Sequence, residues 1–124
     1  MIYLLRRRAH FSSAHRLTAV AEGHPCGQLH GHTWEVEIEL RVSVLPEEGW
    51  VMDFKDVDAA LHPLVQQLDH KVLNDIPGLQ NPTSEHIAMW FMQALRQALP
   101  NLCAVRVRES ARSEVEVRLP EPIP

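Results

Sequence analysis

Hydrophobic and charged residues alternate most regularly between about His32 and Val44, and this period of two predicts a half-buried β-strand. Its apolar positions are Trp34, Val36, Ile38, Leu40, Val42 and Val44, and glutamates fill most of the positions between them. A second strand is expected from Ile2 to about Ser13, with Leu5, Ala9 and Phe11 on its inner face.

The middle of the chain changes to helical periodicity. Asp53 suits an N-cap, and apolar residues at helical spacing predict a first helix that reaches about Leu68. Asn81-Pro82 fits the start of a second helix, because proline at the first helical position loses no hydrogen bond, and Pro100 is expected to stop it. Two further alternating segments, Cys103 to Glu109 and Glu114 to Leu119, predict a hairpin. The order β-β-α-α-β-β predicts an α+β fold with an antiparallel sheet.

Size and composition narrow the class of protein. With 124 residues and 45% hydrophobic content, one domain over residues 1–124 is expected. The apolar runs are too short for a membrane span, no signal peptide is recognised, and two cysteines make a poor disulfide framework, so we expect a cytoplasmic protein without a membrane partner. The net charge of −4 argues against general nucleic-acid binding, since surfaces that follow phosphates carry a basic excess.

Histidines are crowded near the start of the chain. Eight are present, and five of them, His10, His15, His24, His30 and His32, fall in the first 32 positions. Alternate residues of a strand point the same way, so His30 and His32 can share one ion across Gly31, and His15 has the parity to supply a third imidazole. Three protein ligands with one open position are typical of catalytic zinc. Taken alone, however, most His-x-His pairs are ordinary surface or core histidines.

Two cysteines receive different interpretations. Cys26 lies four residues before His30, in a polar loop that suits a buried apolar thiol poorly. It is either a fourth ligand that closes a structural zinc site or a free thiolate that acts as base or nucleophile. Cys103 shares the parity of Val105 and Val107 and is expected in the core.

Several carboxylates and hydroxyls are further candidates. Asp69 and His70 follow the first helix and can form a proton-transfer pair, although a cationic histidine at a helix C-terminus is also simply stabilising. Glu109 points toward the apolar side of its strand, where it would bind the N-H groups of a ligand or pair with an arginine such as Arg112. The set Thr83, Ser84 and Glu85 is also explained by capping of the second helix.

An ordered set of motifs gives this chain a strong resemblance to the 6-pyruvoyl-tetrahydropterin synthase and 6-carboxytetrahydropterin synthase family. The motifs are Ala14-His15-Arg16, Cys26-Gly27-Gln28-Leu29-His30-Gly31-His32, Asp53-Phe54, Leu68-Asp69-His70, Asn81-Pro82-Thr83-Ser84-Glu85 and Arg108-Glu109-Ser110. The short spacing from Cys26 to His30 and the stretch Leu73 to Gly78 resemble the bacterial 6-carboxytetrahydropterin synthase branch. Ser110, where threonine is commoner, and Lys71, where a second histidine is often found, depart from that pattern.

The resemblance implies the tunnelling fold, a four-stranded antiparallel sheet with two helices on one face. Subunits of this family form trimeric barrels that stack as a homohexamer, with sites shared between subunits. It also implies zinc on His15, His30 and His32, proton transfer by Cys26 with Asp69 and His70, and a pterin held by Glu109 together with Thr83 and Ser84.

The implied reaction is a lyase reaction on 7,8-dihydroneopterin triphosphate. It yields 6-carboxy-5,6,7,8-tetrahydropterin for queuosine and 7-deazapurine synthesis, with release of acetaldehyde and triphosphate. The alternatives are a pyruvoyl-forming synthase with the same substrate and a non-catalytic zinc-stabilised binding module. Nothing in the spacing of Arg16, Lys71, Arg108 or the run from Arg6 to Arg8 selects the residues that bind the triphosphate.

Overall fold

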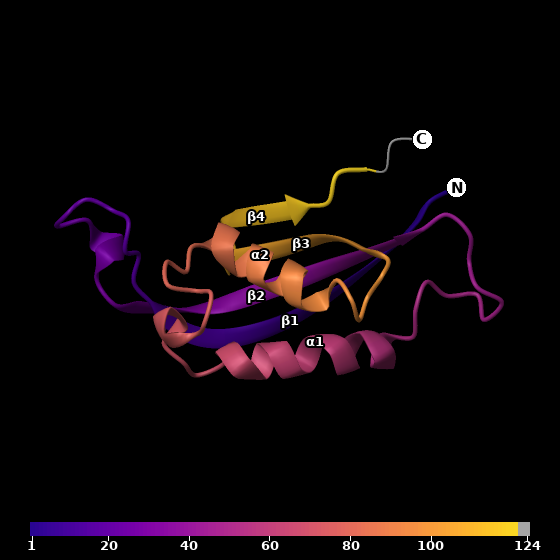
Figure 1. Ribbon diagram of the computed structural model, residues 1–124, viewed down its shortest axis with the longest axis horizontal. Helices are drawn as coiled ribbons and strands as arrows, with labels where there is room; N and C mark the ends of the chain where they lie inside the picture. The colour runs from indigo at the N-terminus through magenta and orange to yellow at the C-terminus, as the bar shows by residue number, and fades with distance from the viewer. Residues whose placement is uncertain (122–124) are drawn as a thin grey trace.

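The computed structural model describes residues 1–121, which form a four-stranded sheet and two α-helices in the expected order β-β-α-α-β-β (Figure 1). The elements are β1 (Tyr3–His15), β2 (His30–Val42), α1 (Phe54–Leu68), α2 (Ser84–Leu95), β3 (Leu102–Ser110) and β4 (Ser113–Arg118). Two short 3-10 turns, η1 (Pro25–Gly27) and η2 (Leu73–Asp75), lie in the connections. Within residues 1–121, no helix is both long and apolar enough to cross a membrane.

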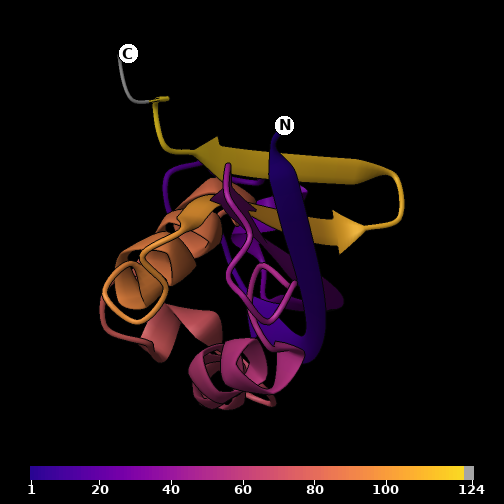
Figure 2. The same cartoon turned by 90° about the vertical axis from the view of Figure 1, so that its right-hand side faces the viewer.

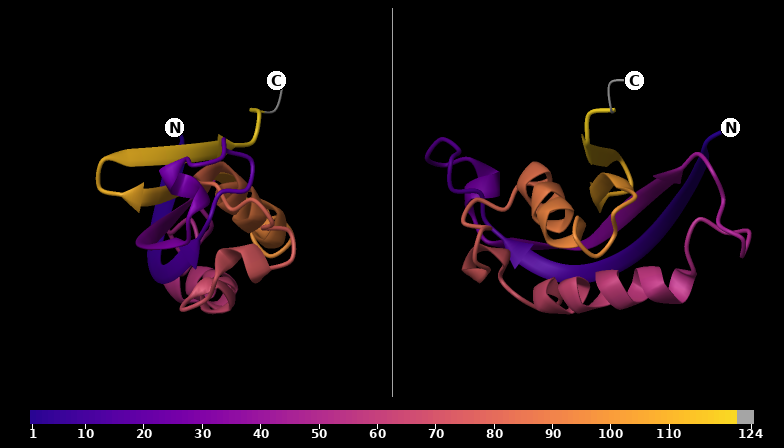
Figure 3. Two further views of the ribbon diagram at one scale, coloured as in Figure 1. Left: turned by 90° about the vertical axis from the view of Figure 1, so that its left-hand side faces the viewer. Right: turned by 45° about the vertical axis from the view of Figure 1, so that its right-hand side comes forward.

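The four-stranded sheet is antiparallel, in the order β1-β2-β3-β4, so that β1 and β4 are its edge strands. Both helices lie on the same side of this twisted sheet (Figure 2). The long strands β1 and β2 bend along their length, and the loop that joins them projects from one end of the sheet (Figure 3). The predicted α+β architecture is confirmed.

The core lies between the helices and the sheet. The even-numbered apolar residues of β2 are buried, from Trp34 at 0% exposure to Leu40 at 1%. From α1 the buried residues are Val57, Leu61, Val65 and Leu68, which recur at the spacing of one helical face.

Element boundaries differ from the expected ones in three places. β1 and β2 extend to His15 and start at His30, because these two residues pair in the sheet register. Val44 is not in a strand and is 79% exposed, since β2 ends at Val42. Thr83, not Pro82, precedes the first turn of α2 as its N-cap, and that helix ends at Leu95, well before Pro100.

Ion pairs cover the face of the sheet that carries no helix. Glu37 and Glu39 of β2 have side chains only 2% and 0% exposed, and Arg106 of β3 lies between them at 3.1 and 2.8 Å. Arg6 and Arg8 of the neighbouring β1 reach the same two carboxylates at 2.9 and 2.6 Å. This charged face is therefore a closed network in which the buried carboxylates are matched by guanidinium groups.

Cys103 belongs to this charged face and not to the core, which corrects the sequence expectation. In β2, Glu39 pairs with Ala104 and the next residue, Leu40, pairs with Leu102, so Cys103 is the extra residue of a β-bulge. Because the bulge shifts the alternation of β3, Cys103 does not share the face of Val105 and Val107. Its thiol donates to Glu39 Oε2 at 3.1 Å. Burial, together with the adjacent Glu39 carboxylate, raises the pKa of Cys103 to about 11.

Candidate active site

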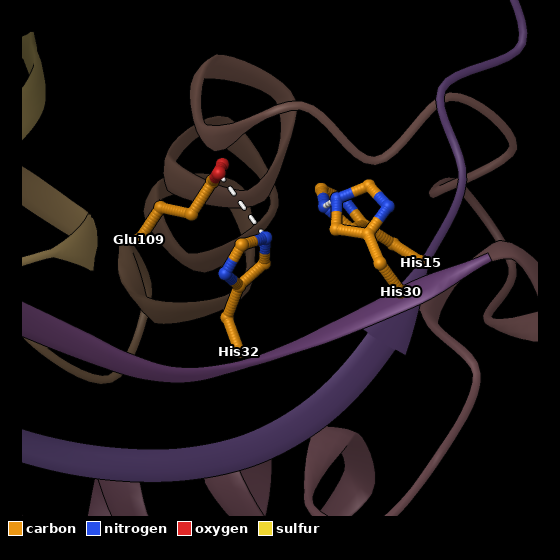
Figure 4. Close-up of side chains that lie close together, drawn as sticks. All are labelled: His15, His30, His32 and Glu109. Carbon is orange, nitrogen blue, oxygen red and sulfur yellow. Dashed lines mark hydrogen bonds and ion pairs between the residues drawn. The ribbon is translucent and has the colours of Figure 1, made fainter. Parts of the chain in front are cut away.

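Three histidines converge where β1 ends and β2 begins. His15 and His30 are direct partners in the sheet register, and His32 lies two residues further along β2, so all three side chains project from the helix-covered face. The side chain of Glu109, near the end of β3, approaches them from the other side (Figure 4). Each of these four residues offers one ligand atom, and these atoms all lie within 4.8 Å of one another.

Backbone carbonyls fix the orientation of two of the rings. Nδ1 of His15 lies 2.7 Å from the carbonyl oxygen of Pro82, and Nδ1 of His30 lies 2.7 Å from that of Gln28. A carbonyl oxygen only accepts, so each Nδ1 carries the proton and each Nε2 presents a lone pair. These two Nε2 atoms lie only 3.0 Å apart, with no proton of a neutral ring between them.

This pair of lone pairs fits a metal ion. Two imidazole nitrogens bound at about 2.0–2.1 Å to a tetrahedral zinc would lie about 3.3 Å apart, close to the separation found between His15 and His30. The third nitrogen, Nε2 of His32, is buried without a well-directed hydrogen bond in the described part of the chain, although Glu109 Oε1 lies 3.1 Å away. A cation between the rings would satisfy all three nitrogens. The histidine cluster, defined as His15, His30 and His32, can therefore hold a metal.

A buried tryptophan supports two of the rings. Trp34 is 0% exposed, and its ring meets those of His15 and His32 edge-on at centroid distances of 4.8 and 5.2 Å. Its indole nitrogen donates to the carbonyl oxygen of Ser13 at 3.2 Å, which holds the ring in place. Burial lowers the pKa of His15, and the hydrogen bond to Pro82 opposes this shift only in part. This shift favours the neutral form of His15, which is the form that binds metals.

Cys26 lies in η1, on the loop between β1 and β2, and is partly buried. Its backbone N-H donates to Nδ1 of His24 at 3.0 Å, and its carbonyl oxygen accepts from the N-H of Leu17 at 2.8 Å. The group of residues in 1–121 that can hold a metal contains no cysteine. The geometry therefore gives no support to a fourth sulfur ligand, and the reactive thiol stays a prediction.

Asp69 and His70 are held together but lie outside the histidine cluster. Asp69 is the C-cap of α1, and its Oδ1 accepts from the N-H of Ser12 at 2.8 Å, which lowers the pKa of its carboxyl group. His70 has a left-handed backbone (φ 57°), and its N-H donates to the carbonyl oxygen of Ser12 at 2.7 Å. Nδ1 of His70 lies 3.0 Å from Asp69 Oδ1, and the side chain is 82% exposed. Both residues are thus fixed to the edge strand β1.

The remaining predicted residues have mixed placements. Thr83 caps α2, and its Oγ1 accepts from the N-H of His86 at 3.1 Å, so the capping role is confirmed. Ser84 is the first residue of that helix. Both directly follow Pro82, whose carbonyl oxygen orients His15, and their contact with a ligand stays a prediction. Glu109 is closest to His32, and no ion pair joins it to Arg112 in residues 1–121.

A model of the 6-pyruvoyl tetrahydropterin synthase family matches residues 4–120, nearly the whole chain. The chain belongs to this family. Within it, the chain is 39% identical over 118 residues to a 6-carboxy-5,6,7,8-tetrahydropterin synthase from Synechocystis sp., covering 90% of both chains. It is 37% identical over 93 residues, 75% of each chain, to a dihydroneopterin monophosphate aldolase from Pyrococcus furiosus.

Solved structures of the 6-pyruvoyl tetrahydropterin synthase family share the fold. The enzyme of this name from Caenorhabditis elegans superposes with a TM-score of 0.87 at 23% identity, over 97% of each chain. Its likeness confirms the sheet and helix arrangement expected for the family. The coarse functional class of the chain is accordingly a pterin-processing lyase.

Sequence reasoning missed the groups that orient the ligands. The carbonyl oxygens of Pro82 and Gln28 belong to the backbone, so their role cannot be inferred from residue type. By its even parity in β2, Trp34 is predicted to share a face with His30 and His32, but the sequence gives no sign that its ring supports theirs. That shared parity is the one signal that could have placed it under the cluster.

Proposed function

We propose that this protein is a zinc-dependent 6-carboxytetrahydropterin synthase. It converts 7,8-dihydroneopterin triphosphate and one water molecule to 6-carboxy-5,6,7,8-tetrahydropterin, acetaldehyde and triphosphate. The observation that carries the proposal is the pair of facing Nε2 lone pairs of His15 and His30, 3.0 Å apart, beside the unsatisfied Nε2 of His32. The identity to the Synechocystis relative of that name supports the choice of reaction.

His15, His30 and His32 would hold the zinc, and a bound zinc would supply Lewis-acid polarisation of the substrate's side-chain hydroxyls. The protein's contribution is the fixed direction of the rings. The carbonyls of Pro82 and Gln28 keep two Nε2 atoms aimed inward, and Trp34 limits rotation of His15 and His32.

Glu109 is proposed to anchor the pterin. Its side chain is 37% exposed beside His32, so one carboxylate is available to accept the paired N-H groups of a pterin edge. Thr83 and Ser84, which follow Pro82 at the start of α2, are proposed to contact the same ligand. A carboxylate with two acceptor oxygens suits such a planar donor pair better than a hydroxyl would.

Cys26 is proposed to move protons at the side-chain carbons, with Asp69 and His70 as its relay. Asp69 and His70 are held by Ser12 of the edge strand β1, and neither is among the residues that can hold the metal. By analogy with the family, whose sites are shared between subunits, we propose that a second copy of the chain completes the relay. β1 and β4 are the edge strands of the sheet, and apart from the contacts of residues 12–14 with residues 70–72 their outer edges make no strand pairing within residues 1–121. We propose edge-to-edge trimers that stack as a hexamer, with the product used in queuosine and 7-deazapurine synthesis in the cytoplasm.

Product analysis tests the reaction. The zinc-loaded protein is incubated with 7,8-dihydroneopterin triphosphate, and pterins and acetaldehyde are measured by chromatography. Equal amounts of acetaldehyde and 6-carboxytetrahydropterin are expected. A pyruvoyl product without acetaldehyde would establish the alternative synthase, and turnover of dihydroneopterin monophosphate alone would favour an aldolase. No turnover of any of these would leave a non-catalytic zinc-stabilised module and overturn the proposal.

Sedimentation tests the assembly. A species near six times the chain mass of 14.2 kDa is expected to carry the activity. An active monomer would contradict the shared site.

A further inference from the structure

The segment Arg16 to Thr18 connects His15 to the loop that carries Cys26, and each of its three N-H groups is tied to a different part of the chain. The N-H of Arg16 donates to Asn74 Oδ1 at 3.0 Å, and the N-H of Thr18 donates to Asn81 Oδ1 at 3.0 Å. Between them, the N-H of Leu17 donates to the carbonyl oxygen of Cys26 at 2.8 Å. The hydrogen bond of Leu17 therefore joins the segment directly to the backbone of Cys26.

Asn74, in η2, uses both ends of its side-chain amide. While Oδ1 accepts from the N-H of Arg16, Nδ2 donates to the carbonyl oxygens of Arg16 at 2.9 Å and Gln80 at 3.2 Å. A carboxylate in this place would turn an oxygen toward two other acceptors, which is repulsive. The position therefore requires an amide.

Asn81 makes a simpler contact. Its side chain accepts from the N-H of Thr18 through Oδ1, and no other hydrogen bond of this side chain is formed with the described residues. Asn81 directly precedes Pro82, whose carbonyl orients His15 at 2.7 Å. Asn81 thus joins the loop to the backbone that orients the metal ligand His15. An aspartate at position 81 could make the same contact, because it keeps the acceptor oxygen.

We propose that Asn74 and Asn81 are positioning residues that hold the loop of residues 16–29 in register with the histidine cluster, and thereby place Cys26 for proton transfer. This inference rests on the proposed function for the role of Cys26. Without either asparagine, the segment after His15 loses one of its three ties while the ligands themselves remain. A displacement of about 1 Å at a reacting group costs up to about 100-fold in rate.

The test compares alanine and aspartate variants at the two positions. Asn74→Ala and Asn81→Ala are expected to lower kcat by about 10- to 100-fold with little change in KM, and to speed amide hydrogen exchange at residues 16–18. Asn81→Asp is expected to restore both kcat and exchange protection, whereas Asn74→Asp is expected to remain impaired. Asn101→Ala is the matched control, because this exposed asparagine accepts only through its backbone carbonyl, from Arg41.

Alkylation by iodoacetamide, mapped by peptide mass spectrometry, gives a readout independent of turnover. The rate at Cys26 is expected to change in both alanine variants, while the rate at Cys103, remote from the loop, stays constant and confirms correct folding. Equal behaviour of the two aspartate variants, or unchanged exchange at residues 16–18 in the alanine variants, would overturn the proposal. If the wild-type protein were inactive on pterins, the proposed function would fail while exchange and alkylation still decided the role of the asparagines.

Discussion

The two faces of β2 carry opposite kinds of polar cluster. On the face without helices, Glu37 and Glu39 are buried but completely matched, by Arg6, Arg8 and Arg106. On the helix-covered face, His30 and His32 of the same strand end in nitrogens that face another lone pair or have no well-directed partner in residues 1–121.

The difference separates a structural cluster from a functional one. A buried charge needs full compensation, and the charged face supplies it from within the chain. The histidine cluster is held just as firmly, by carbonyls and by Trp34, yet its inward atoms are left for something outside the chain. Unsatisfied groups that are rigidly supported mark a site, whereas the number of polar residues does not.

Removal of one histidine of the cluster is expected to have the largest effect and tests whether the cluster is the functional one. His30→Ala is expected to lower zinc content well below one per chain and to reduce turnover by more than about 100-fold. Metal analysis and the acetaldehyde assay measure the two effects. His10→Ala is the matched control, since His10 is 61% exposed and pairs with Glu35 outside the cluster. Full activity in His30→Ala would remove the site assignment altogether.

Replacing Cys26 separates metal binding from chemistry. Cys26→Ala is expected to keep zinc near one per chain and to lose turnover, because the thiol is not among the residues that can hold the metal. Zinc analysis and product assays on the same sample give the answer. Joint loss of zinc and turnover would instead show that the sulfur is a ligand, and Cys103→Ala provides the comparison.

Acid should weaken the charged face in a defined pH window. Burial alone would raise the pKa of Glu39, but hydrogen bonds from Arg106, Cys103 and Arg118 lower it to about 2. Since the folded pKa lies below the ordinary value of 4.5, this stabilisation is complete above about pH 4.5 and is lost as the pH falls toward 2. Its full size is of the order of 3 kcal/mol.

Denaturant unfolding of wild type and Glu39→Gln between pH 7 and pH 2 measures this effect. The variant is expected to be less stable at neutral pH and to lose less stability on acidification. Glu48→Gln, in an exposed turn, should follow the wild-type curve. Parallel slopes for Glu39→Gln and wild type would show that Glu39 is not the linked group.

The smallest expected effect concerns the cap of α2. Thr83→Ala should cost about 1 kcal/mol of stability through the lost N-cap, and Thr83→Ser should restore it. Thermal unfolding measures the first, and KM for 7,8-dihydroneopterin triphosphate tests whether Thr83 also contacts substrate. A raised KM in Thr83→Ala with normal stability would show that Thr83 acts mainly in substrate binding and not as the N-cap of α2.

The fold and the histidine cluster could be predicted because both follow from alternation. The period of two located β1 and β2. His15 has the parity of the inner face of β1, and His30 and His32 have that of the inner face of β2, so the pattern placed all three on one face of the sheet. Alternation does not reveal that Glu37 and Glu39, on the opposite face, are also buried, because their burial comes from neighbouring arginines.

Other features could not be predicted because they depend on a single backbone event or on contacts distant in sequence. A bulge turned Cys103 to the charged face. The hydrogen bonds of Ser12 fix Asp69 and His70 to β1. Neither a bulge position nor a carbonyl direction has a signature in residue type.

β2 carries the histidines at even positions and the glutamates at odd ones. Its register with β1 is therefore fixed on both faces of the sheet, by the histidine cluster on one and by the ion pairs on the other. A slip of one residue would drive Glu37 and Glu39 into the apolar interior and turn His30 and His32 away from His15. A single inserted or deleted residue within His30–Val42 is therefore the least tolerable change in this strand, even where every side chain type is kept.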